Sequence, residues 1–265
     1  MPKFAANLSF LFQELEFLDR FEAARRAGFQ AVEYLFPYDH PPAEIAARLD
    51  DNGLSQALFN LSPGDWDAGE RGLTALPGRE DDFRRSVDTA LRYADALGCR
   101  RLHVLAAIVP DGADARACED AYVANLAHAA DAFGREGIRA LIEPLNTTDN
   151  PGYLLSTAGH AQRVIETVGS PNLFLQYDLY HRQIMEGSLA AGFAQHREII
   201  AHIQIAGVPG RHEPDVGEIN YPYLFDMLDA AGYDGWVGCE YRPRGGTLDG
   251  LGWLAPYGIG TGLIA

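Results

Sequence analysis

Apolar segments of two kinds alternate along the whole chain. One kind is short, rich in branched and aromatic residues and bounded by glycine, proline or charged residues, which is typical of buried strands. The other kind has apolar residues three or four positions apart, as at Phe17, Phe21 and Ala24, which is typical of an amphipathic helix. The following Gly28 marks the end of that helix. The pattern predicts strands and helices in regular alternation.

Eight strand–helix pairs can be placed in this way. The predicted strands are residues 4–12, 31–36, 54–61, 101–108, 139–146, 173–181, 201–207 and 236–243. The predicted helices are residues 17–29, 42–53, 80–98, 118–137, 157–169, 189–200, 221–232 and 249–258. Strands that alternate with helices indicate βαβ units and a parallel sheet.

Eight such units in 265 residues have the size of a (β/α)8 TIM barrel of the α/β class. We therefore expect residues 1–265 to form a single TIM-barrel domain. The alternative is an open doubly wound sheet, which would usually carry a glycine-rich phosphate-binding turn after its first strand. Residues 7–12 contain no glycine, and the glycines of residues 258–263 follow no strand. We expect those last residues to be a flexible tail.

The charge of the chain limits its partners. Its formal net charge is −16, whereas a nucleic-acid-binding protein usually needs a basic face. We therefore expect a small-molecule substrate and no nucleic acid. If that substrate is an anion, arginine or histidine side chains must reverse the field close to the site.

Cysteine content and hydropathy bear on location. The three cysteines, Cys99, Cys118 and Cys239, form no CxxC pair, and an odd number argues against a disulfide framework. The first residues lack the apolar core of a signal peptide. No run reaches the roughly 18 apolar residues of a membrane span. We expect a cytoplasmic protein with no membrane segment.

Polar residues stand near the ends of the last four predicted strands, in apolar surroundings: Glu143, Asp178, Gln204 and Glu240. Taken singly, such a residue is more often a helix cap or a surface group. Because the active site of a TIM barrel lies at the C-terminal ends of its strands, side chains of one parity there would converge. Three carboxylates in one dry pocket repel each other unless some are protonated or a cation neutralises them. An all-oxygen ligand set favours Mg²⁺ or Mn²⁺ over zinc.

This arrangement predicts a reaction type. A divalent metal on a carbonyl and its neighbouring hydroxyl acidifies the C–H bond between them and stabilises an enediolate. Glu143 and Glu240, on strands five and eight, are the predicted acid/base pair, since one carboxylate can remove the proton and another can return it. Asp178, the shorter acid, is the predicted purely structural ligand.

Four segments of the chain, the last of which contains Glu240, resemble a known family. The chain resembles the hydroxypyruvate isomerases, and the related 2-oxo-tetronate isomerases, of the xylose-isomerase-like TIM barrels. The resembling segments are residues 4–12, 21–38, 66–79 and 209–243, the last containing "PGRHEP", "GEINYP" and "GCEYRP". The resemblance implies conversion of hydroxypyruvate to tartronate semialdehyde, or of the four-carbon 2-oxo-tetronate analogue. It also implies a homo-oligomer, either a dimer or a tetramer.

The resemblance also implies roles for individual residues. A metal is bound by Glu143, Asp178, Gln204 and Glu240, and the two glutamates are the acid/base catalysts. His181 matches a histidine that contacts substrate oxygens in related sugar epimerases. Those epimerases carry histidine where this chain has Gln204, which weakens an epimerase assignment.

Further candidates come from loops near the strand ends. Arg211 and His212 lie in the long segment 207–222, and Arg242 follows Glu240 by two positions. They are the predicted substrate-binding residues, since arginine suits bidentate contact with a carboxylate, although each could instead be a solvated surface group.

Other polar residues near the predicted strand ends carry weaker expectations. Trp66, Glu70 and Arg71, in segment 62–78, could cover the site or form a subunit contact. Asn146 and Asp149 could support the site residues, and His103 is expected to pack in the core.

Other functions remain open from the sequence. A ketose 3-epimerase would use the same two-carboxylate chemistry on an uncharged sugar. An apurinic-endonuclease-like phosphodiesterase would need a histidine-rich zinc cluster and a basic groove, which the net charge of −16 disfavours. A metabolite-binding barrel without catalysis would need only one cation site, and the presence of both Glu143 and Glu240 argues against it.

Overall fold

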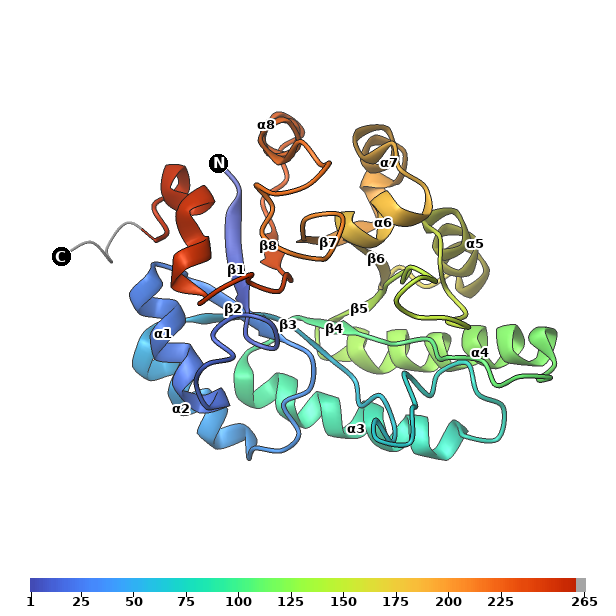
Figure 1. Cartoon of the computed structure of the whole chain (residues 1–265). Coiled ribbons are helices and arrows are strands. Elements are labelled where there is room, and N and C mark those ends of the chain that lie inside the picture. The colour runs from blue at the N-terminus through green and yellow to red at the C-terminus, as the bar shows by residue number, and fades with distance from the viewer. Residues whose placement is uncertain (261–265) are drawn as a thin grey trace.

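The strands of the computed structural model, which describes residues 1–260, close into a barrel (Figure 1). All eight strands are parallel, each pairs with the next along the chain, and β8 pairs with β1. The strands are β1 (Lys3–Asn7), β2 (Ala31–Tyr34), β3 (Ser55–Asn60), β4 (Arg101–His103), β5 (Arg139–Ile142), β6 (Leu173–Asp178), β7 (Ile200–Ile205) and β8 (Trp236–Cys239). The predicted TIM barrel is confirmed.

Helices surround the barrel on the outside, as Figure 1 shows. The α-helices are α1 (Arg20–Ala27), α2 (Pro42–Asn52), α3 (Glu80–Leu97), α4 (Ala115–Arg135), α5 (Ala158–Val168), α6 (Leu179–Met185), α7 (Leu189–His196) and α8 (Tyr221–Ala230). Three 3₁₀ segments accompany them: η1 (Phe17–Asp19), η2 (Arg197–Ile199) and η3 (Leu248–Tyr257). In the part of the chain that the structure describes, none of these helices combines the length and hydropathy that a bilayer span requires.

Helix α3 illustrates how the sequence makes these elements. Phe83, Val87 and Ala90 recur three or four positions apart and are buried in the core, as an amphipathic helix requires. Acidic residues occupy its first turn, where they favour the positive end of the helix dipole. Gly98 ends the helix in a left-handed conformation with φ +61°, which glycine adopts without a steric penalty.

The strands are shorter in the structure than predicted, and for β4 and β6 hydrogen bonds give the reason. The sequence predicts one strand over 173–181, but β6 ends at Asp178, whose Oδ1 accepts a hydrogen bond from the backbone N–H of Tyr180, 2.7 Å away. Asp178 thereby caps α6, so His181 lies in the first turn of a helix and not at a strand end. Beyond His103, β4 gives way to a loop, because the carbonyls of Leu105 and Ala106 bond to loop 62–78 rather than to a strand.

The predicted C-terminal tail divides into two parts. Ile259 is buried, and the backbone N–H of Gly260 donates to the carbonyl oxygen of Ala27 at 2.7 Å. Residues 258–260 are therefore packed against the end of α1, contrary to the prediction of a flexible tail. Residues 261–263, the rest of that prediction, lie outside the described residues.

Candidate active site

A cavity of about 1130 Å³ lies at the C-terminal ends of the strands. Every strand is followed by residues that line it, and these include Phe10, Phe36, Trp66, Leu105, Glu143, His181, Arg211, Glu240 and Arg242. The position is the one that TIM barrels use for their active sites.

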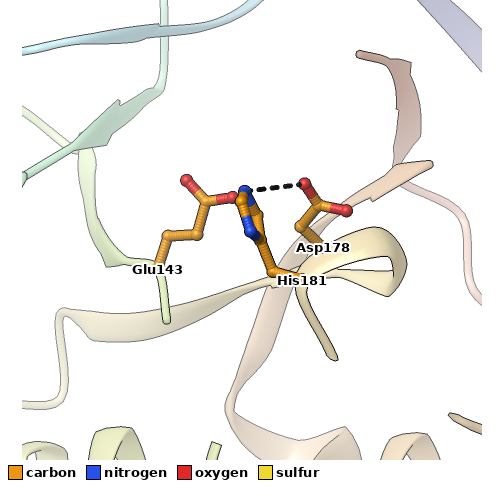
Figure 2. A group of neighbouring side chains, drawn as sticks. All are labelled: Glu143, Asp178 and His181. Carbon is orange, nitrogen blue, oxygen red and sulfur yellow. Dashed lines mark ion pairs between the residues drawn. The ribbon is translucent and has the colours of Figure 1, made fainter. Parts of the chain in front are cut away.

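Three buried acidic groups gather here: Glu143 and Glu240 line the cavity, and Asp178 lies next to them. Glu143 follows β5, Asp178 ends β6 and Glu240 follows β8, and each of these side chains is buried. Ligand atoms of Glu143, Asp178 and His181 all lie within 4.8 Å of one another, which is close enough to hold a metal ion. Figure 2 shows the imidazole of His181 between the two carboxylates, with its Nε2 3.6 Å from Asp178 Oδ2.

Two hydrogen bonds determine which nitrogen of His181 carries its proton. Nδ1 accepts from the backbone N–H of Asn146 at 3.0 Å, and the Asn146 side-chain amide lies 2.8 Å from the same nitrogen. Burial and the nearby charge of Arg211 hold the pKa of His181 well below its usual range. A neutral imidazole that accepts at Nδ1 carries its proton on Nε2. His181 therefore offers an N–H donor to the cavity, which suits contact with a substrate oxygen better than metal ligation.

Arg211 forms ion pairs with two of the acids. Its Nη2 lies 2.5 Å from Glu240 Oε2 and 3.5 Å from Asp178 Oδ2. The guanidinium lies 4.9 Å from the ring of Phe10 and 4.9 Å from the ring of Tyr180. Arg211 thus reaches the acidic centre itself and supplies positive charge there.

The pKa values of the carboxyl groups follow from this crowding. Burial raises the pKa of Glu143 well above its usual range, and the charges of Glu240 and Asp178 raise it further. Burial raises the pKa of Glu240 to about 8, although Arg211 opposes the shift. Burial also raises the pKa of Asp178, again against the effect of Arg211. Arg211 alone therefore leaves these acids short of positive charge.

These residues fit a divalent cation. Among the described residues, Glu143 Oε1 is a buried oxygen with no hydrogen-bond partner, which leaves a ligand atom available. A cation would favour the charged carboxylates in the same way that Arg211 does. Hard oxygen donors of this kind suit Mg²⁺ or Mn²⁺.

Gln204 of β7 lies beside this centre, with both ends of its amide engaged. Its Nε2 donates to Glu33 Oε1 at 2.8 Å, and its Oε1 accepts from Gln176 Nε2 at 2.5 Å. An amide oxygen has a second lone pair, so the contact with Gln176 leaves one for a cation. Its role as a ligand stays a prediction.

The other predicted substrate-binding residues lie in different places. Arg242 is exposed and lines the cavity, with its guanidinium 6.0 Å from the ring of Phe10. His212 is not among the residues that line the cavity, and its Nδ1 lies 2.8 Å from the carbonyl oxygen of Arg242. The structure thus brings Arg211, Arg242 and His181 to the cavity lining, whereas His212 is not part of that lining.

The loop after β3 extends over one side of the cavity. Trp66 and Arg71 line it, and the guanidinium of Arg71 lies 3.5 Å from the indole ring. Glu70 forms an ion pair with Arg79 at the start of α3, which ties this loop to the helix. Asn146 is buried beside His181, and its Nδ2 donates to Oδ2 of Asp149, which lines the cavity, at 3.0 Å. Asn146 thus supports the orientation of His181.

Sequence reasoning missed several polar residues of this region. Asn7, Glu33, Gln176 and His202 are all buried in the barrel strands and hydrogen-bond to one another or to the acidic residues. His103, predicted to pack in the core, lines the cavity with its Nδ1 3.5 Å from Glu143 Oε2. The sequence does contain a feature that could have identified them. Each is a polar residue within an apolar strand segment, as are the polar residues at the last four strand ends.

Comparisons with known proteins agree with this geometry. Residues 21–257 match the family model of the xylose isomerase-like TIM barrel. The 2-oxo-tetronate isomerase of Cupriavidus necator is 58% identical over 257 residues, which cover 97% of this chain and 99% of that protein. The hydroxypyruvate isomerase of Escherichia coli is 47% identical over 257 residues, 97% of this chain and all of that protein (100%).

A solved structure is also similar over nearly the whole chain. The crystal structure named AP endonuclease, family 2, from Brucella melitensis superposes with a TM-score of 0.95 at 52% sequence identity, covering 97% of this chain and 99% of that one. The barrel, the buried acidic centre and the matches over nearly the full length agree. The chain belongs to the xylose isomerase-like TIM-barrel family and, within it, to the hydroxypyruvate and 2-oxo-tetronate isomerases.

Proposed function

We propose that this isomerase moves the carbonyl group of a small hydroxy-oxo acid to the neighbouring hydroxyl-bearing carbon by proton transfer through an enediolate. The observation that carries the proposal is the pair Glu143 and Glu240. They follow β5 and β8, they are buried and line one cavity, and the pKa of each is raised. A carboxyl group with a raised pKa can hold or accept a proton near neutral pH, as general acid/base catalysis requires.

The substrate is hydroxypyruvate or its four-carbon 2-oxo-tetronate analogue. The chain is 58% identical to the 2-oxo-tetronate isomerase of Cupriavidus necator and 47% identical to the hydroxypyruvate isomerase of Escherichia coli. The higher identity favours the four-carbon acid. For hydroxypyruvate the product is tartronate semialdehyde. The proton leaves C3 and a proton enters at C2, while the hydroxyl hydrogen moves from the C3 oxygen to the C2 oxygen, so atoms and charge balance.

A divalent metal, Mg²⁺ or Mn²⁺, completes the proposed site. Glu143, Asp178, Gln204 and Glu240 would hold it. When bound, such a cation acidifies the C–H bond beside the carbonyl and stabilises the negative charge of the enediolate. Asp178 would serve only as a ligand, because its Oδ1 already caps α6.

The protein's own residues would share the remaining work. One glutamate removes the proton from carbon and the other returns a proton to the neighbouring carbon. His181 donates its Nε2–H to a substrate oxygen, an orientation supported by the two contacts of Asn146 with Nδ1. Both glutamates are buried at the cavity wall, each 4% exposed, so few waters would compete with substrate for their carboxyl groups.

Positive charge at the cavity would bind the substrate carboxylate. Arg211 reaches the acidic centre, and Arg242 lines the cavity without an ion pair to any residue among 1–260. Arg242 is therefore the freer of the two for bidentate contact with a carboxylate. Binding at this rim would place the hydroxy-ketone end of the acid toward Glu143 and Glu240.

Proton NMR in D₂O tests the proposal. We expect the C3 proton signal of hydroxypyruvate, or the corresponding signal of 2-oxo-tetronate, to disappear as the isomer forms. The loss should require added Mg²⁺ or Mn²⁺, and EDTA should stop it. Glu143→Gln serves as the inactive control. Exchange with neither acid, but with a ketohexose, would replace the proposal by the 3-epimerase alternative.

A further inference from the structure

A fourth buried acid lies below the acidic centre. Glu33, on β2, is 0% exposed, and its side chain contacts two amide groups that donate to it and one imidazole. Its Oε1 accepts from Asn7 Nδ2 at 3.0 Å and from Gln204 Nε2 at 2.8 Å, and its Oε2 lies 2.7 Å from His202 Nε2. Hydrogen-bond partners at both oxygens lower the cost of burying this side chain.

Asn7, which donates to Glu33, also contacts Glu240. The second hydrogen of Asn7 Nδ2 is directed to Glu240 Oε1, 3.2 Å away. The amide cannot be turned around, because Asn7 Oδ1 accepts from the backbone N–H of Ser9 at 3.0 Å. Asn7 therefore bridges Glu33 and Glu240 through a single NH₂ group.

Gln204, which also donates to Glu33, is connected to Glu143 through Gln176. Because a carboxylate only accepts, Gln204 must turn its NH₂ group to Glu33 and its oxygen away. That oxygen accepts from Gln176 Nε2 at 2.5 Å, and the same nitrogen donates to Glu143 Oε2 at 2.9 Å. Glu33 thus sets the direction of both amides in this second bridge.

The barrel also leaves room for Glu33 on a distant strand. A Cβ placed on Gly238 of β8 would lie 2.2 Å from Glu33 Oε1. Any side chain larger than hydrogen at position 238 would therefore displace the carboxylate. This glycine is an observation independent of the hydrogen bonds, and it indicates the same fixed place for Glu33.

From these contacts we infer that Glu33 is a positioning residue that holds both Glu143 and Glu240 through two amide bridges. It touches neither the cavity nor either glutamate directly, and it acts through Asn7 on one side and through Gln204 and Gln176 on the other. One buried side chain thereby fixes the two proposed acid/base groups relative to each other. The inference rests on the proposed function, but it makes a separate prediction about Mn²⁺ binding.

The experiment compares Glu33→Gln, Asn7→Ala and their double variant with the parent protein. We expect each single change to lower kcat by about 10- to 100-fold, as loss of supporting hydrogen bonds does, with KM changed by less than about threefold. In the double variant, Asn7→Ala should cost little more, since its anchor is already lost; coupled residues are non-additive. Gln56→Leu is the matched control, because it removes a buried amide of β3 whose one hydrogen bond among residues 1–260 is to the carbonyl oxygen of Leu58.

Mn²⁺ affinity, measured from the EPR signal of free Mn²⁺, gives a readout without turnover. Glu33→Gln should weaken it by about 10-fold, and Gln56→Leu should not. Unchanged kcat and Mn²⁺ affinity in Glu33→Gln, or fully additive losses in the double variant, would overturn the inference.

The proposed function and the inference can fail separately. A parent protein that binds Mn²⁺ but isomerises neither acid would refute the proposed function. The Mn²⁺ affinity of Glu33→Gln would then decide whether Glu33 is a positioning residue. A parent protein that neither binds Mn²⁺ nor isomerises either acid would overturn the proposed function and the inference together. If Glu33→Gln does not fold, Asn7→Ala and Gln176→Ala decide, because each breaks one bridge: unchanged kcat and Mn²⁺ affinity in both would overturn the inference.

Discussion

Arg211 Nη2 lies 2.5 Å from Glu240 Oε2, so a predicted substrate clamp is in direct contact with a predicted catalytic acid. The same nitrogen is 3.5 Å from Asp178 Oδ2. Arg211 thus acts as an internal counter-ion for the acidic centre. It could bind a substrate carboxylate only while it shares its charge with the two acids.

We predict that Arg211→Ala raises KM for carboxylated substrates by at least about 10-fold, since loss of one charged hydrogen bond costs about 1.5–3 kcal/mol. It should also lower kcat, because the Glu240 carboxyl loses the charge that opposes its raised pKa. Steady-state kinetics with hydroxypyruvate and 2-oxo-tetronate measures both constants. Arg244→Ala is a suitable control, because Arg244 pairs with Glu213 outside the cavity lining. An unchanged KM would remove Arg211 as a substrate contact.

We predict that Glu143→Gln and Glu240→Gln each lower kcat by about 10²- to 10⁴-fold, the contribution usual for general acid/base groups. Glutamine has the same shape as glutamate and keeps one oxygen acceptor, so the barrel should stay folded. Turnover and far-UV circular dichroism should be measured on the same preparations. Activity like that of the parent in either variant would refute the acid/base assignment.

The raised pKa of Glu240 predicts that the metal-free protein loses stability as pH rises. Its folded pKa is about 8, against an ordinary value of 4.5, so between these values the folded state binds more protons than the unfolded state. The stability that this group contributes is then fully present below pH 4.5 and is lost as pH rises through about 8. Melting temperatures with EDTA should therefore fall over this range.

Added Mn²⁺ should reverse that trend, because a cation favours the deprotonated acids and its binding releases protons. Glu240→Gln removes one titrating group and should flatten the metal-free curve. A metal-free melting temperature that rises steadily from about pH 5 to about pH 8 would contradict the proposed origin of the shift.

The last four strand ends can be identified from sequence because each breaks an apolar run with a polar residue. Glu143 and Glu240 line one cavity, and Asp178 lies close to Glu143 with ligand atoms within 4.8 Å; their roles stay predictions. The same signal at Glu33 and Asn7 is harder to interpret, because these residues occur within or at the end of early strands that carry no other acid. Their partners lie far away in the sequence, on β7 and after β8. The hydrogen bond between Glu33 and His202, for example, spans 169 positions.

Local hydrogen bonds could not be foreseen from apolar periodicity. The side chain of Asp178 ends β6 and starts α6 by accepting from the N–H of Tyr180, and this turns His181 into a helical residue. The position of His212 depends in the same way on a contact with the backbone of Arg242, 30 positions away. The strand and helix periods of the sequence predict which side chains are buried. The positions of His181 and His212 depend instead on single hydrogen bonds, which no such period predicts.

The final prediction concerns Trp66, which could cover the cavity or form a subunit contact. The indole is 44% exposed, lines the cavity, and packs against the ring of Phe36 at 5.4 Å between centroids. Because its inner face borders the cavity, we expect Trp66→Ala to raise KM by about 10-fold, the effect of losing roughly 1.4 kcal/mol of binding, and to leave the oligomeric state unchanged. Kinetics and size-exclusion chromatography with light scattering separate the two roles: a change of oligomer at constant KM would assign Trp66 to a subunit interface.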